Sequence, residues 1–75
     1  MFETLKKFII EEVHVNPEDI TMDAELSGDL GINSLELADL VIACEERFDI
    51  EIPDEDLHNF TTVGDVVRFL EENAN

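Results

Sequence analysis

Ser34 is the residue whose type and position best suit covalent chemistry. It follows Asn33, a favourable helix N-cap, and Glu36 stands three residues after that cap, which is the capping-box spacing for a helix start. The spacing predicts Ser34 at the first helical position, among backbone N–H groups that lack a partner within the helix. Such groups favour an anion, above all a phosphate. We expect the Ser34 hydroxyl to carry a phosphodiester rather than to act as a nucleophile, because no base stands beside it.

The other reactive side chains form no recognisable catalytic or metal-binding group. His14 and His58 are isolated near expected helix ends, where a partly positive imidazole suits the helix dipole, and no third ligand at suitable spacing predicts a zinc site. Cys44 falls on the apolar side of its helix and is expected to be a small buried side chain. No Gly-x-Ser-x-Gly elbow surrounds Ser34, so the sequence does not predict an enzyme.

A calcium-binding loop is the alternative for the segment before the serine. Asp23, Glu25 and Ser27 match the first, third and fifth positions of such a loop, and Gly28 matches the sixth. The twelfth position should be a glutamate, but it is Ser34. An acidic calcium-binding module, or a helical interaction module without a prosthetic group, is therefore the alternative class of function.

The acidic composition restricts the possible partners. The chain has 75 residues, with 20 Asp and Glu against 4 Lys and Arg, and a net charge of −16. We expect a single domain over residues 1–75 and a monomer. Nucleic acid and anionic membranes carry the same sign of charge and are poor partners, whereas a basic protein surface is favoured. One cysteine, and the lack of a signal-peptide or membrane-spanning run, predict a cytoplasmic protein.

Helical periodicity predicts an all-α fold. Apolar residues recur at helical spacing over residues 2–13, 34–48 and 63–70, and a short helix is expected near 54–58. Three longer helices and one short helix predict a small four-helix bundle, with a long loop between the first two. Residues 71–75 are expected to fray.

The long loop, from about residue 15 to 33, is expected to be ordered rather than a linker. Gly28 and Gly31 provide freedom to turn. Apolar residues spread along it are expected to anchor it to the core: Ile20, Met22, Leu26, Leu30 and Ile32.

The second helix has two apolar faces. One is expected to face the core and consists of Leu37, Leu40, Val41, Cys44 and Phe48. The other combines Leu35, Ala38 and Ile42 with the acidic residues Asp39, Glu45 and Glu46. An apolar face framed by carboxylates suits a basic partner with an apolar pocket. The alternative is that the helix is central and packs on both sides, but the nearness of Ser34 favours docking.

These residues resemble the acyl carrier protein family, in particular the free-standing carriers of bacterial type II fatty acid synthesis. The resemblance covers nearly the whole chain. It is carried by Asp29-Leu30-Gly31-Ile32-Asn33-Ser34-Leu35-Glu36, by the phrase from Phe48 to Glu55 with the preceding Glu45-Glu46, and by Thr61-Thr62-Val63.

The resemblance implies that Ser34 carries a 4′-phosphopantetheine arm, transferred from coenzyme A by a phosphopantetheinyl transferase. The protein would be a phosphoprotein of lipid metabolism that holds acyl groups as thioesters and performs no catalysis itself. A polyketide or peptidyl carrier is the alternative within the carriers. The strong acidity and the segment from Asp49 to Glu55 favour fatty acid biosynthesis.

The resemblance also implies two sets of contact residues. Synthase enzymes and the transferase, with basic docking patches, would recognise Leu35, Glu36, Asp39, Ile42, Glu45 and Glu46. The acyl chain would lie in a cleft lined by Leu40, Cys44, Ile52, Leu57, Phe60 and Val66.

Two residues depart from the family pattern. Asn33 stands where the family usually has Asp, which removes a charge beside the attachment point, and Arg47 interrupts an acidic run. Asn and Asp cap a helix about equally well, so the fold should not change. Both departures fit a carrier that serves a dedicated pathway.

Overall fold

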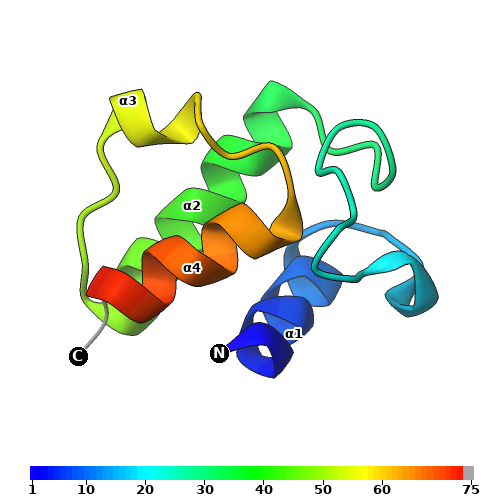
Figure 1. Ribbon diagram of the computed structural model, residues 1–75, viewed down its shortest axis with the longest axis horizontal. Coiled ribbons are helices and arrows are strands. Elements are labelled where there is room, and N and C mark those ends of the chain that lie inside the picture. Colours follow the sequence, from blue (N-terminus) through cyan, green and yellow to red (C-terminus); the bar gives the residue numbers. More distant parts are fainter. Residues whose placement is uncertain (74–75) are drawn as a thin grey trace.

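The computed structural model describes residues 1–73, and these form an all-helical bundle (Figure 1). This confirms the predicted fold class, with three longer helices, one short helix and a long loop between the first two. An additional 3₁₀ turn, η1, lies within the long loop. The elements are α1 (Phe2–Glu12), η1 (Pro17–Asp19), α2 (Ser34–Phe48), α3 (Asp54–Leu57) and α4 (Val63–Asn73).

Helix α1 packs against both α2 and α4 (Figure 1). Its apolar residues recur at helical spacing, so Leu5 and Ile9 fall on one side, where both are fully buried. Phe8 extends the contact to α2, since its ring meets that of Phe48 edge-on with centroids 5.8 Å apart. Such edge-to-face pairs add about 0.5–1.5 kcal/mol beyond the area that they bury.

Four of the five predicted anchors hold the long loop against the core. The side chains of Ile20, Leu26, Leu30 and Ile32 are at most 8% exposed. The prediction for Met22 was wrong, because its side chain is 41% exposed. The loop is therefore an ordered part of the bundle, as expected.

Backbone hydrogen bonds also join the long loop to the start of α4. Leu26 N–H donates to the carbonyl oxygen of Thr61 at 2.9 Å, and Val63 N–H donates to that of Ala24 at 3.0 Å. These bonds satisfy loop groups that would otherwise be buried without a partner. The long loop thus helps to fix the position at which α4 begins, although the two segments are far apart in the sequence.

The last helix is longer than expected. The side chains of Val63, Val66, Val67 and Leu70 are buried, as the periodicity predicted. Residues 71–73 are helical, so the expectation that they fray was wrong. The final two residues of the predicted frayed segment lie outside the described part of the chain.

Candidate functional site

The start of α2 is capped as the sequence predicts. The Asn33 side chain accepts a hydrogen bond from the Glu36 N–H at 2.8 Å, and Glu36 Oε1 accepts one from the Asn33 N–H at 3.2 Å. This reciprocal pair is a capping box. It fixes the direction in which the chain enters the helix, and so it fixes the position of Ser34.

The turn before the cap depends on Gly31. This residue has a φ of 67°, in the left-handed region that glycine adopts without strain. Directly after it, Ile32 N–H donates to the Leu26 carbonyl oxygen at 2.9 Å, and the Ile32 side chain is buried. The chain therefore reaches Asn33 from a point anchored in the core.

The Ser34 hydroxyl lies open at the first helical position. The residue is exposed, and within residues 1–73 its side chain has no hydrogen-bond partner. The neighbouring N–H groups of Ser34 and Leu35 likewise have no protein acceptor in the described part of the chain. An exposed hydroxyl beside free N–H donors suits a covalently attached phosphate. Within residues 1–73, no imidazole or carboxylate forms a hydrogen bond with the hydroxyl that would activate it as a nucleophile.

A small pocket opens directly beside Ser34. It has a volume of about 170 Å³, and its lining comes from the first turns of α2 and from the end of α3: Ser34, Leu37, Ala38, Leu57 and His58. A cavity of about 150 Å³ is known to hold a benzene molecule. The pocket can therefore take a short apolar group, but not a long acyl chain.

Most of the residues predicted to line an acyl cleft lie in the core. Leu40, Cys44, Ile52 and Val66 are at most 6% exposed, while Leu57 and Phe60 are half-buried. Of these six residues only Leu57 also lines the pocket beside Ser34. The pocket and the buried residues adjoin through Leu57, and the predicted cleft itself stays a prediction.

Three pocket residues were not predicted to belong to the site. Leu37 was assigned to the core, Ala38 to the second apolar face of α2, and His58 to a structural role at a helix end. The helical pattern could have indicated Leu37 and Ala38, which share a face with the helix start. The pattern could not indicate His58, because this residue belongs to the α3 segment. Its place beside α2 depends on how that segment folds back.

The outer face of α2 is exposed beside the site. Leu35 is 78% exposed and Ile42 is 52% exposed, and the acidic residues Asp39 and Glu46 are exposed with them. We call these four residues the outer face. Large apolar side chains this open, framed by carboxylates, have the composition expected of a docking surface.

Two residues of the predicted docking set also have structural partners. Glu36 belongs to the capping box, and Glu45 Oε2 accepts a hydrogen bond from the Ile52 N–H at 2.9 Å. The second bond links α2 to the segment that leads into α3. Both residues are half-buried, so they are less available to a partner than Asp39 and Glu46.

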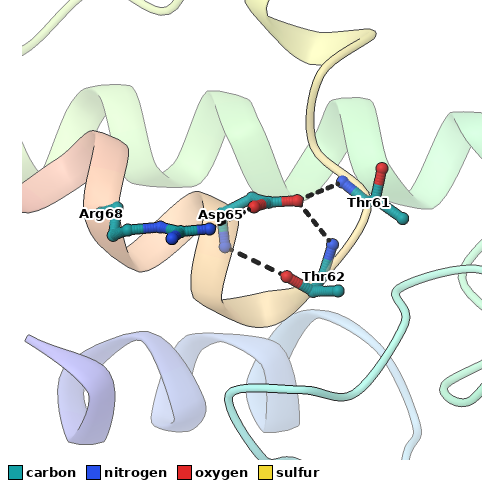
Figure 2. Close-up of polar contacts among 4 residues, drawn as sticks. All are labelled: Thr61, Thr62, Asp65 and Arg68. Carbon is teal, nitrogen blue, oxygen red and sulfur yellow. Dashed lines mark hydrogen bonds and ion pairs between the residues drawn. The ribbon is translucent and has the colours of Figure 1, made fainter.

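A second capping box fixes the junction between α3 and α4 (Figure 2). Asp65 Oδ2 accepts hydrogen bonds from the N–H groups of Thr61 and Thr62, each at 3.0 Å, and Thr62 Oγ1 accepts one from the Asp65 N–H at 3.3 Å. The N–H groups of Thr62 and Thr61, with further help from Arg68, hold the pKa of the Asp65 carboxyl below its usual value. Thr62 therefore caps the start of α4.

Cys44 lies in the core, as predicted. Its side chain is 1% exposed, and burial, followed by the charges of Glu12 and Glu45, raises the pKa of its thiol from 9.0 to about 11. At neutral pH the thiol is therefore protonated and shielded. Such a cysteine is not a reactive nucleophile.

The described residues offer no protein-built metal centre. Across residues 1–73, no group of three or more His, Cys, Asp or Glu side chains is arranged to hold a metal ion. In the segment that resembles a calcium loop, Asp29 Oδ2 instead accepts a hydrogen bond from the Glu25 N–H at 2.8 Å.

Comparison with known proteins identifies the family. The family described as "Phosphopantetheine attachment site" matches residues 3–70. The acyl carrier protein of Wolinella succinogenes is 45% identical over 73 residues, which cover 97% of this chain and 96% of that protein. The chain belongs to the acyl carrier protein family. The acyl carrier proteins of Clostridium perfringens, 45% identical over 99% of this chain and 97% of their own length, and of Helicobacter pylori, 42% identical over 97% and 94%, agree with this.

Membership of this family implies a covalently attached 4′-phosphopantetheine group. The start of α2 in this carrier fits such a group, because an exposed hydroxyl, free backbone N–H donors and an adjoining apolar pocket lie together there. Among residues 1–73 of the carrier, no helix combines the length and the apolar character that a membrane crossing requires.

Proposed function

We propose that the chain carries acyl groups on a 4′-phosphopantetheine arm attached to the Oγ atom of Ser34, and that it serves fatty acid biosynthesis. The proposal rests above all on one observation. The Ser34 hydroxyl is exposed, has no hydrogen-bond partner within residues 1–73 and lines an apolar pocket, within the residues that match the family. We also propose that the protein acts in the cytoplasm, which is the source of its coenzyme A.

Attachment needs an external base, since no side chain of residues 1–73 forms a hydrogen bond with the Ser34 hydroxyl. In this step Ser34 Oγ forms a bond to the β-phosphorus of coenzyme A, the bond to the α-phosphate oxygen breaks, and adenosine 3′,5′-bisphosphate leaves. The hydroxyl proton passes to a base of the transferase. The free N–H groups of Ser34 and Leu35 are placed to donate to the resulting phosphodiester.

The arm, once attached, supplies a terminal thiol that holds acyl groups as thioesters. The chain's own residues bind and present this cargo. Leu37, Ala38 and Leu57 offer an apolar surface for its first carbons. Because the pocket holds only a small group, a longer chain must displace side chains of the predicted cleft, such as Leu40 and Ile52.

The outer face of α2 is proposed as the docking surface for the transferase and for acyl-transferring enzymes. Its carboxylates, Asp39 and Glu46, would meet basic residues, and Leu35 and Ile42 would fill an apolar pocket of the partner. Charge complementarity of this kind raises association rates and orients the partners. Each partner in turn would thus find the arm at the same end of α2.

Mass spectrometry tests the proposal. After incubation with coenzyme A and a broad-specificity transferase, the protein should gain the mass of one phosphopantetheine group. Ser34→Ala should abolish the gain, while Ser27→Ala should not affect it. Ser27 is a suitable control because it is the only other serine and is also exposed.

The same preparation separates the alternatives. An unmodified protein beside an active transferase control would favour the helical interaction module, and tight stoichiometric calcium binding by isothermal titration would favour the calcium module. If the protein is loaded, comparing how well fatty acid, polyketide and peptide synthases use it would distinguish the types of carrier. We expect a fatty acid synthase enzyme to use it best.

A further inference from the structure

His58 and Ser34 line the same pocket at the start of α2. His58 is the C-cap residue of α3, and it lines the pocket together with Ser34, Leu37, Ala38 and Leu57. Figure 1 shows α3 at the same end of the bundle as the first turn of α2. The imidazole and the serine hydroxyl are the two polar side chains in an otherwise apolar lining.

The His58 imidazole is not engaged by the fold. The residue is exposed, and within residues 1–73 its side chain forms neither a hydrogen bond nor an ion pair. Its backbone N–H, by contrast, is satisfied by the Asp56 carbonyl oxygen. A structural role for the imidazole at the helix end, as the sequence suggested, is therefore not evident in its contacts.

Charged residues lie on the elements around His58. On its own helix they are the acidic residues Asp54, Glu55 and Asp56. The wall that α2 contributes to the pocket has no titratable group. On the side of α4, the charged residues Asp65, Arg68 and Glu72 line a different pocket, which His58 does not line.

Among residues 1–73, His58 is also the one basic residue that lines the pocket. The four Lys and Arg residues lie elsewhere: Lys6 and Lys7 on α1, Arg47 in the last turn of α2, and Arg68 on α4, paired with Asp65. A phosphodiester on Ser34 would place a negative charge at this pocket. A protonated imidazole is the natural partner for that charge, because charge-assisted hydrogen bonds are stronger than neutral ones.

We propose that His58 is a positioning residue for the arm, and that its protonated imidazole pairs with the phosphodiester on Ser34. The proposal rests on the proposed function, since it requires the arm at Ser34. Histidine changes charge near neutral pH, so the pairing strengthens as the pH falls and weakens as it rises. Protonated His58 thus holds the arm toward the pocket, and the neutral imidazole releases it.

Phosphorus NMR of the loaded protein tests this pairing. A phosphodiester does not itself titrate from about pH 5.5 to about pH 8, so a change in its resonance over that range reports a neighbour that does. We expect a single sigmoidal step in the loaded wild-type protein. The step should be absent in His58→Ala, and also in His58→Gln, which keeps an N–H donor but cannot become charged.

His14 provides the matched control. It is the only other histidine and is also exposed, but it lies in the connection between α1 and η1, away from the pocket. His14→Gln should keep the full step. Proton NMR gives a reciprocal readout: the His58 imidazole should titrate at higher pH in the loaded protein than in the apo protein, and His14 should titrate alike in both.

The outcomes are decisive and separable. A flat phosphorus resonance in the loaded wild type, or an unchanged step in His58→Ala, would overturn the pairing while leaving the carrier function intact. An unchanged protein mass, with no phosphodiester resonance, would overturn the proposed function and the pairing together. Circular dichroism of each variant checks the fold, which should not change, because the His58 side chain is exposed and forms no hydrogen bond or ion pair within residues 1–73.

Discussion

Gly64 N–H donates a hydrogen bond to the Met22 carbonyl oxygen at 2.9 Å, and a Cβ atom added at residue 64 would lie 2.9 Å from that same oxygen. The long loop and the first turn of α4 therefore approach too closely for a side chain. The obstacle is backbone, so it cannot rotate away. A glycine that weakens the helix in isolation is required by the tertiary contact.

Gly64→Ala should therefore destabilise the protein. Alanine gains about 1 kcal/mol over glycine inside a helix, but crowding against packed backbone costs about 1–3 kcal/mol, so we expect a net loss of stability. Urea unfolding measures the change. Gly28→Ala is the control, since the atom nearest its added Cβ is the mobile Glu25 carboxylate oxygen at 2.8 Å. A Gly64 variant as stable as wild type would contradict the close approach.

Asp65→Asn should lower stability by roughly 1 kcal/mol near neutral pH, because the carboxylate accepts two backbone hydrogen bonds. Folding lowers the pKa of Asp65, so its contribution is present above the unfolded pKa of 3.8 and is lost as the pH falls through the folded value. Thermal unfolding from pH 7 into the acid range should show the two proteins converge. Glu71→Gln, an exposed acid on the same helix, should have little effect. A constant difference down to low pH would be inconsistent with this carboxylate's role.

Cys44 should react slowly with a thiol reagent such as DTNB at pH 8 and rapidly once urea unfolds the protein. Burial and a pKa of about 11 both suppress the thiolate in the native state. Because the folded pKa lies above 9.0, stability should fall as the pH rises from about 9 toward 11, where only the unfolded chain ionises. In Cys44→Ala, the loss of stability that is caused by ionisation of this thiol should be absent. Fast native labelling would show that the core is open at Cys44.

Charge reversal on the outer face should slow transfer reactions without altering the fold. At low salt, Asp39→Lys and Glu46→Lys should each reduce the rate of loading by the transferase, and added salt should narrow the difference, because it screens exposed charges. Glu18→Lys, an equal change on η1, is the control. Helicity is followed by circular dichroism. Equal loading rates for all three variants and wild type at low salt would show that the outer face is not the docking surface.

Local signals in the sequence predicted much of this structure. The capping box of Asn33 and Glu36 is a rule of four adjacent residues, and the periodicity of α1 and α4 reflects the geometry of the helix itself. Such features depend little on the rest of the fold, so they can be recognised before the fold is known. The exposed outer face of α2 followed from the same periodicity.

The features that the sequence did not predict are contacts between different segments of the chain. The bond from Ile52 to Glu45 joins α2 to the segment that leads into α3, and the approach of Gly64 to Met22 joins α4 to the long loop. Met22 looked like an anchor by type, but the backbone bonds that order its segment leave its side chain exposed. The place of His58 beside Ser34 likewise depends on how the α3 segment returns to the start of α2.

Tandem mass spectrometry of proteolytic peptides is the most direct measurement of the central claim. After loading with coenzyme A, the account predicts phosphopantetheine on the peptide that contains Ser34, with fragment ions that place it on that serine. A modified Ser27 or threonine, or an unmodified protein beside a loaded control carrier, would contradict it.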